Sequence, residues 1–158
     1  MNTTREASSP VPWPPIIYGV AALTAALLGW LAGWSFEAPE YRTMGMLVGI
    51  AMSVLAVAMG AMAGGLFSRA GTPIPPNRPT TALVVDGVFT WTRNPMYLGF
   101  SLLLLGLGLV VDQLWFVIAV PLAMLAVTKL AIEREEAYLE RKFGADYVAY
   151  KTRVRRWL

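Results

Sequence analysis

The sequence predicts an all-α integral membrane protein with four transmembrane helices, the last two forming a short helical hairpin. Hydrophobic residues make up 56% of the 158 residues, and the mean hydropathy is +0.54. Several uncharged runs approach or exceed the roughly 20 residues that cross a bilayer as a helix. Basic residues gather near the C-terminal end of the sequence, which the positive-inside rule assigns to the cytoplasm.

The first two spans are predicted at Ile16–Trp34 and Thr43–Phe67, which contain no charged residue. A proline-rich connector, Arg69–Thr92, follows them, and no single helix can run through it. Because this connector carries Arg69 and Arg78, we expect it on the cytoplasmic side of the membrane.

The next apolar run, Met96–Ile132, is too long for one straight span. The polar pair Asp112-Gln113 divides it into two short arms, which predicts a helical hairpin whose second arm is kinked at Pro121. With four spans and both termini in the cytoplasm, every loop lies on the side that the positive-inside rule assigns to it. We expect this membrane to be the inner membrane of a bacterium.

The sequence contains neither cysteine nor histidine. This composition excludes disulfides, metal sites built on Cys or His, thiol nucleophiles and imidazole bases, and we predict no metal site. The net charge of +3 is modest, and we expect no nucleic-acid partner.

The stretch TRNPMYLGF, residues 92–100, places polar groups at the mouth of an apolar run, where they are expensive to bury. Asn94 suits an N-cap and Pro95 suits a first helical turn, so the third span is predicted to begin here. The positive end of its dipole could hold an anion or a cofactor carboxylate beside Arg93. An ordinary capped helix with an interfacial Tyr97 explains the local residues equally well.

The stretch LLLLGLGLVVDQ contains Gly106 and Gly108, which leave a notch without side chains. A flat adenine-like ring could lie against this bare backbone. Helix packing explains the two glycines at least as well, and the dinucleotide-binding fingerprint is not present.

The stretch LAIEREEAYLERKFG places a carboxylate in an apolar row. On a helix, Ile132, Glu136, Leu139 and Phe143 share one face. Glu136 is followed four residues later by Glu140 rather than by a basic residue, unlike a solvated face of ion pairs. The alternative is a charged helix that emerges into the cytosol.

The final stretch, DYVAYKTRVRRWL, begins after Gly144 and predicts one interfacial amphipathic helix. Its apolar stripe consists of Tyr147, Tyr150, Val154 and Trp157. The helix could lie on anionic lipid, or it could cover a cavity with Tyr147 and Arg153.

These stretches in this order resemble the isoprenylcysteine carboxyl methyltransferase family and the related phospholipid methyltransferases. The matching parts are GVFTWTRNPMYLG, a short apolar hairpin, the Glu135-Glu136 pair and FGADYVAYKTRV, which together cover about Pro79–Val154. No part is specific alone, whereas the ordered set is. The resemblance implies a methyltransferase that binds S-adenosylmethionine near the cytoplasmic face, releases S-adenosylhomocysteine, and receives a lipophilic acceptor from the bilayer.

The resemblance also implies roles for individual residues. The cofactor-binding positions, with the glycine notch added, are Arg93, Asn94, Pro95, Tyr97, Gly99, Gly106, Gly108, Glu135, Glu136 and Tyr147. Arg153 would orient the acceptor, and it is predicted as a catalytic residue together with Glu136. Many members carry histidine where this chain has Asn94, and an amide cannot titrate near neutral pH. Residues 1–158 are then one membrane domain, with a two-span pair over 1–68 and the methyltransferase-like core over 69–158.

The residues leave the acceptor and two other functions open. A carboxylate or thiolate acceptor is slightly favoured over an amine, because an ammonium group must first lose a proton and the sequence has no histidine base. The expected acceptor is an isoprenylcysteine-like carboxylate or a related small lipid. The alternatives are an NADPH-dependent membrane reductase of the sterol-reductase-like class, which would need more basic contacts, and a non-enzymatic membrane scaffold with a lipid-binding tail. Membrane lipids are expected partners, and the oligomeric state is left open.

Overall fold

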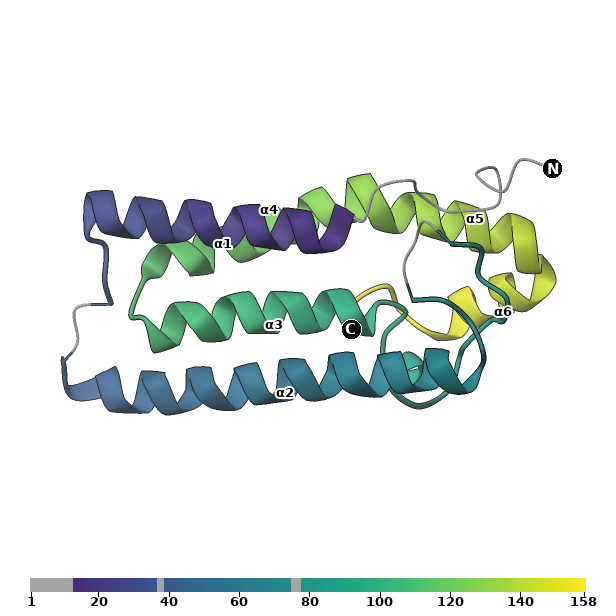
Figure 1. Cartoon of the computed structure of the whole chain (residues 1–158), viewed down its shortest axis with the longest axis horizontal. Coiled ribbons are helices and arrows are strands. Elements are labelled where there is room, and N and C mark those ends of the chain that lie inside the picture. The colour runs from purple at the N-terminus through teal and green to yellow at the C-terminus, as the bar shows by residue number, and fades with distance from the viewer. Residues whose placement is uncertain (1–12, 37–38, 75–77) are drawn as a thin grey trace.

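The part of the chain that the structure describes is helical, with no β-strand. The structure is a computed structural model that describes residues 13–36, 39–74 and 78–158. In these residues the α-helices are α1 (Trp13–Ala32), α2 (Arg42–Arg69), α3 (Pro95–Val110), α4 (Leu114–Val127), α5 (Glu133–Phe143) and α6 (Ala145–Arg153) (Figure 1). The predicted all-α class is therefore confirmed.

The first two helices cover most of the two apolar runs predicted as spans. α1 ends at Ala32 because Gly33 adopts a left-handed conformation (φ 64°), and the amide of Gly33 closes the helix by donating to the carbonyl of Gly29. α2 follows a short 3₁₀ turn, η2 (Pro39–Tyr41). It runs for 28 residues along the length of the molecule (Figure 1).

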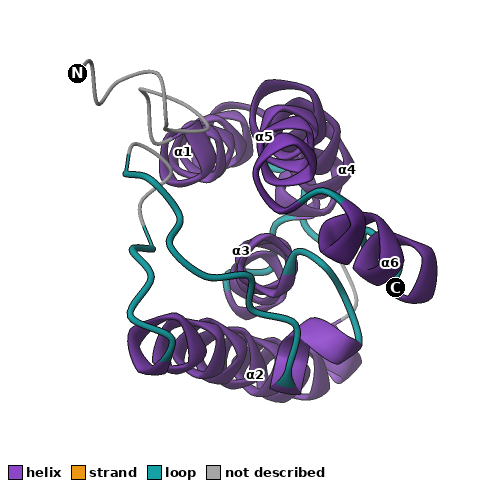
Figure 2. Cartoon of the chain, turned by 90° about the vertical axis from the view of Figure 1, so that its right-hand side faces the viewer, coloured by secondary structure: helices purple, strands orange, loops and turns teal. Residues whose placement is uncertain are grey.

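The central helix of the bundle is α3. α2 packs along one side of α3, α4 packs on another side, and α1 packs mainly against α4 (Figure 2). The backbones of α2 and α3 approach closely at Gly49 and Gly106: a Cβ atom added to Gly106 would lie 2.7 Å from the carbonyl oxygen of Gly49. Small residues at a helix crossing permit this approach. The crossing fixes α3 against the longest helix.

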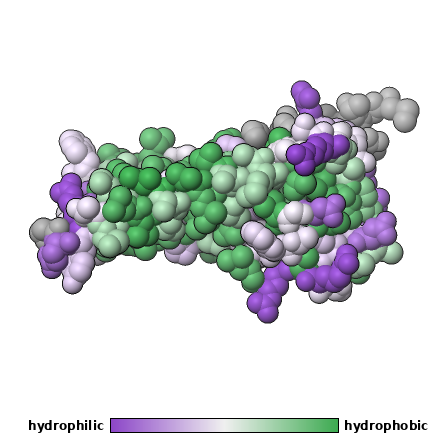
Figure 3. All heavy atoms as spheres, turned by 90° about the horizontal axis from the view of Figure 1, so that it is seen from below, coloured by the Kyte–Doolittle hydropathy of each residue, from purple (hydrophilic) through white to green (hydrophobic). Residues whose placement is uncertain are grey.

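Three helical segments of the described chain are long and apolar enough to cross a membrane. They are Trp13–Ala32, Arg42–Arg69 and the continuous run Leu114–Phe143. Hydrophobic residues cover the middle of the molecule and polar residues gather at its two ends (Figure 3). The protein is therefore an integral membrane protein. α3 is apolar but has 16 residues, so the predicted count of four spans and the predicted short hairpin remain predictions.

The charged end of the bundle is built from three kinds of segment. A π-helical segment, η4 (Thr128–Ile132), joins α4 to α5 without a break, so the charged helix α5 continues the apolar helix α4. The proline-rich connector is irregular where it is described, apart from one 3₁₀ turn, η3 (Gly87–Thr90). α6 folds back after Gly144, which has a positive φ of 52°. Connector, α5 and α6 meet beside the first turn of α3 (Figure 1).

The prediction of one amphipathic helix through Leu158 is wrong for the last five residues. α6 ends at Arg153, and Val154 is extended, with φ −119° and ψ 131°. The chain then runs back to the start of α3, where the carbonyl oxygen of Arg155 accepts a hydrogen bond from the amide of Arg93 (3.0 Å). The amide of Val154 still donates to Tyr150 in α6, whereas the carbonyl oxygens of Arg155 and Arg156 accept hydrogen bonds from residues 92–94 instead of from another helical turn.

Candidate functional site

The segment before α3 begins the site. α3 starts at Pro95, as predicted, but the side chain of Asn94 does not cap the helix. Its Nδ2 atom instead donates to the carbonyl oxygen of Arg156 (2.8 Å), and the hydroxyl of Thr92 donates to the same oxygen (3.0 Å). The Thr92 hydroxyl also accepts a hydrogen bond from the amide of Asn94 (3.1 Å). These hydrogen bonds, together with the bond between Arg93 and Arg155, hold two irregular segments side by side: residues 92–94 and residues 155–156.

Glu136 lies between two arginines from these two segments. The guanidinium of Arg156 binds the Glu136 carboxylate in a bidentate manner: Nε donates to Oε1 (3.0 Å) and Nη2 donates to Oε2 (2.7 Å). Arg93 adds an ion pair from Nη1 to Oε1 (3.2 Å). The side chains of Arg93 and Glu136 are each only 9% exposed. The apolar row on α5 thus places Glu136 inside the protein, as the spacing predicts, and its charge is balanced there.

The neighbouring carboxylate, Glu135, has a different partner. The hydroxyl of Tyr97, on the first turn of α3, donates to Glu135 Oε2 (2.7 Å). Among the described residues, no arginine or lysine forms an ion pair with Glu135. The two adjacent glutamates therefore differ: Glu136 is bound by cations, whereas Glu135 is bound by a neutral hydroxyl.

Two tyrosines of α6 close the other side of the cluster. Tyr147 and Tyr150 are buried, and the hydroxyl of Tyr150 donates to the carbonyl of Phe89 in η3 (2.8 Å). Burial raises the pKa of Tyr147 to about 12, and the negative charge of Glu136 adds to this rise. Near neutral pH, Tyr147 is consequently an uncharged hydroxyl beside two carboxylates. It can donate or accept a hydrogen bond.

Two cavities meet at this cluster. The first, of about 120 Å³, has apolar lining residues such as Leu83, Val84 and Leu139, and it also contains the charged groups of the cluster, for which we call it the polar cavity. Its polar side chains from three segments are Arg93 and Asn94, Glu135 and Glu136, and Tyr147. The second, of about 320 Å³, is mostly apolar. It is lined by Pro14, Pro15, Phe67, Ile74, Phe89, Arg93, Asn94, Pro95, Met96, Tyr97, Phe100 and Glu135. The two cavities adjoin along a mixed wall, with the polar side chains of Arg93, Asn94 and Glu135 beside apolar ones. The apolar residues of this shared wall are Phe67, Ile74 and Phe89.

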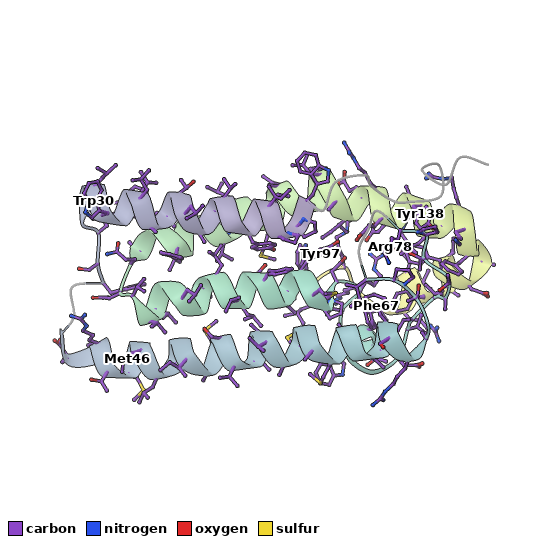
Figure 4. The ribbon with its side chains drawn as sticks, in the orientation of Figure 1. Trp30, Met46, Phe67, Arg78, Tyr97 and Tyr138 are labelled. Carbon is purple, nitrogen blue, oxygen red and sulfur yellow. The ribbon has the colours of Figure 1, made fainter. Side chains whose placement is uncertain are left out.

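The cluster lies at one end of the bundle. Tyr97, Phe67, Arg78 and Tyr138 are found at the end that carries α5 and α6, whereas Trp30 and Met46 lie at the opposite end (Figure 4). Of the residues predicted for the site, those around this end are Arg93, Asn94, Pro95, Tyr97, Glu135, Glu136 and Tyr147. The structure therefore brings together three stretches that are far apart in the sequence.

Four predicted site residues lie elsewhere. Gly99 faces the backbone of Ala56 in α2, and Gly106 faces Gly49 and Ser53 in the same helix. Gly108 is covered by the side chain of Phe116 in α4. Arg153 is exposed, and its Nε donates to the carbonyl of Ala149 one turn earlier in α6. None of these four lines either of the two cavities.

Sequence reasoning missed Arg156, which makes the closest contact with Glu136. In the sequence, Arg153, Arg155 and Arg156 are equivalent members of a basic tail. Only the end of α6 at Arg153 and the reversal of the chain distinguish them. The one available signal was Trp157, an apolar residue beside the arginines, which indicates that part of the tail is held against the protein. Trp157 does pack at the edge of the main apolar core.

The chain is similar to one protein family and to several known proteins. A family model described as phospholipid methyltransferase matches residues 41–146, a range that includes Arg93, Glu135 and Glu136 and ends before Arg156. An uncharacterized protein of Haemophilus influenzae is 43% identical over 63 residues, which is 40% of this chain and all of that protein. No solved structure matches the chain.

Two yeast enzymes also resemble part of the chain. They are proteins named protein-S-isoprenylcysteine O-methyltransferase, from Schizosaccharomyces pombe (32% identical) and Saccharomyces cerevisiae (33% identical). Each similarity extends over 72 residues, which is 46% of this chain and 30% of the yeast protein. The chain thus matches less than a third of the length of these two enzymes.

Proposed function

Because the chain belongs to the phospholipid methyltransferase family, we propose that it moves a methyl group from S-adenosylmethionine to a lipophilic acceptor at the cytoplasmic face of the membrane. The acceptor class that we propose is an isoprenylcysteine-like carboxylate or a related small lipid. The yeast enzymes named above act, by their names, on protein-linked isoprenylcysteine.

The observation that carries the proposal is the pair of cavities that share Arg93, Asn94 and Glu135. A methyl transfer between a water-soluble donor and a membrane-soluble acceptor requires a polar site and an apolar site with a common boundary. The cluster at the end of the bundle has this form. Its position at the charged end of an otherwise apolar bundle also supports a reaction at a membrane surface (Figure 3).

The polar side chains fit the proposed cofactor. Two buried atoms of Arg93, Nε and Nη1, have no hydrogen-bond partner among the described residues; Nη1 is near Glu136 but does not have hydrogen-bond geometry. Buried donors of this kind are costly unless a partner binds, and the carboxylate of S-adenosylmethionine would supply one. Glu135 and Glu136 offer acceptors for its ribose hydroxyls and ammonium group.

The bound cofactor would supply an electrophilic methyl group on a sulfonium. The residues of the chain would then bind and align the two reactants, because direct transfer depends chiefly on position and orientation. Arg93 and Asn94 would hold the donor on the polar side, and the apolar wall around Phe100 and Met96 would hold the hydrocarbon of the acceptor. Glu135 lies at the boundary, where it could accept a proton from an acceptor that carries one.

We also propose the topology of the complete bundle. The chain would cross the inner membrane of a bacterium four times, with α3 and α4 as the last two spans and both termini in the cytoplasm. The arginines at positions 69, 78 and 93 and the basic residues of α5, α6 and the tail support this orientation.

Equilibrium binding to the purified protein in detergent tests the function. S-adenosylmethionine, S-adenosylhomocysteine and NADPH are each titrated by isothermal calorimetry. We expect binding of the first two ligands and none of NADPH. Binding of NADPH alone would support a reductase instead, and binding of none of the three would contradict the proposal. Transfer of a radioactive methyl group to a carboxylate, a thiol and an amine lipid would then separate the acceptor classes.

A further inference from the structure

We propose that Arg156 is a positioning residue that orients the Glu136 carboxylate toward the cofactor cavity. This inference rests on the proposed function, and it deepens that function by adding a residue of the chain's last segment to the site. Arg156 lies outside residues 41–146, the range matched by the family model, so the inference rests on the contacts of this chain alone.

The first support is the geometry of the contact. Arg156 binds both oxygens of Glu136 through two nitrogens, at 3.0 Å and 2.7 Å, whereas Arg93 reaches only Oε1. A planar fork on a carboxylate fixes the rotation of the carboxylate as well as its position. Oε2 has no other ion-pair or hydrogen-bond partner among the described residues. Arg156 therefore determines where Oε2 points.

The second support is the side from which Arg156 approaches. Glu136 lines the polar cavity, but Arg156 lines neither that cavity nor the apolar one. A ligand in the polar cavity would thus contact Glu136 and not Arg156. A carboxylate accepts about four hydrogen bonds, and Arg156 donates two to Glu136 while Arg93 forms only an ion pair, so Glu136 keeps acceptor capacity for a ligand.

The third support is the way in which Arg156 is held. Its carbonyl oxygen accepts hydrogen bonds from Thr92 and Asn94, and the carbonyl oxygen of Arg155 accepts one from the amide of Arg93. The backbone beside Arg156 is therefore attached to the residues that immediately precede α3. Arg93 and Arg156 approach Glu136 from adjoining segments, and the geometry of one depends on the other.

The test compares three variants by calorimetric titration with S-adenosylmethionine. Arg156→Ala should raise the dissociation constant by about tenfold, because Glu136 loses a charged hydrogen-bond pair. Arg156→Lys should restore part of the lost affinity for S-adenosylmethionine, since an ammonium contacts one oxygen at a time. Arg155→Ala is the matched control: it removes an equal charge from the adjacent, exposed side chain and should change the constant by less than about twofold.

A double-mutant cycle separates positioning from a general effect on the tail. In the Glu136→Gln background, Arg156→Ala should have little further effect on binding, because Arg156 acts through that carboxylate. Full additivity of the two substitutions, or equal effects of Arg156→Ala and Arg155→Ala, would overturn the inference. Binding of S-adenosylmethionine to the unmodified protein is measured first. Its absence would contradict the proposed function, whereas its presence without an Arg156 effect would contradict only the role of Arg156.

Discussion

The hydroxyl of Tyr97 donates a 2.7 Å hydrogen bond to Glu135, across 38 positions of sequence and between α3 and α5. This is the only hydrogen bond to Glu135 among the described residues, and the two side chains meet where the polar and the apolar cavity share a wall. The start of α3 and the charged helix α5 are thereby joined at the proposed boundary between the two reactants.

Replacement of Tyr97 by Phe should therefore destabilise the protein by about 1–3 kcal/mol, because a partly buried carboxylate loses its donor. Unfolding in mixed detergent micelles, followed by circular dichroism, measures the change. Tyr41→Phe is the control, since Tyr41 is exposed at the start of α2. An equal response of the two variants would show that the hydrogen bond contributes little.

Replacement of Glu136 by Gln should weaken the binding of S-adenosylmethionine by about 1–3 kcal/mol, because a charged acceptor in a buried site is lost. Glu140→Gln should have almost no effect, since Glu140 is exposed and pairs with Lys151 on the surface. Calorimetric titration of both variants gives the comparison. If Glu140→Gln weakened binding as much, the apolar row on α5 would not be the feature that selects Glu136.

Replacement of Gly106 by Ala should reduce stability rather than cofactor affinity. The added Cβ would lie 2.7 Å from both the Gly49 carbonyl oxygen and the Ser53 hydroxyl, and overpacking of this kind costs about 1–3 kcal/mol. Gly60→Ala in α2 is the control, because nothing lies within 4 Å of its Cβ position. Lost affinity with unchanged unfolding would instead support the glycine notch as a ligand surface.

Cysteines at Asp86 and Thr152 should react only with a reagent that reaches the cytoplasm, and a cysteine at Glu40 should react from the opposite side. All three residues are exposed, and the chain has no cysteine of its own. The proposed orientation follows from the distribution of basic residues. Reaction of Asp86→Cys and Glu40→Cys from the same side would contradict a topology in which α2 crosses the membrane.

The parts of the structure that depend on local sequence could be predicted well. The apolar runs predicted α1 and α2, and the Asn94-Pro95 pair predicted the first residue of α3. The three- and four-residue spacing around Glu136 predicted its burial, because a helix places such positions on one face. Each of these signals lies within one continuous helical segment or at its first residue.

The parts that depend on contacts between distant segments could not be predicted. No glycine or proline marks the end of α6 at Arg153, so the reversal of the tail has no signal in its own residues. The sequence around Gly106 fits either a ligand surface or close packing against another helix. Only the position of α2, which lies against Gly106, distinguishes these two roles. Arg156 was indistinguishable from Arg155 for the same reason: its partner is 20 positions away.

The π-helical segment η4 sets the angular phase of the helix that follows it. Successive residues of an α-helix are rotated by about 100°, and a π turn accommodates an additional residue without breaking the helix. If all five residues of Thr128–Ile132 adopted regular α-helical geometry instead, the additional residue would take a full helical step and rotate α5 by about 100° relative to α4. The membrane-facing surface of α4 would be unchanged, while Glu135 and Glu136 would turn away from Tyr97 and Arg93. Deletion of one residue from these five, which leaves a regular α-helix, should therefore displace Glu135 and Glu136 less than deletion of one residue from the α-helical part of α4.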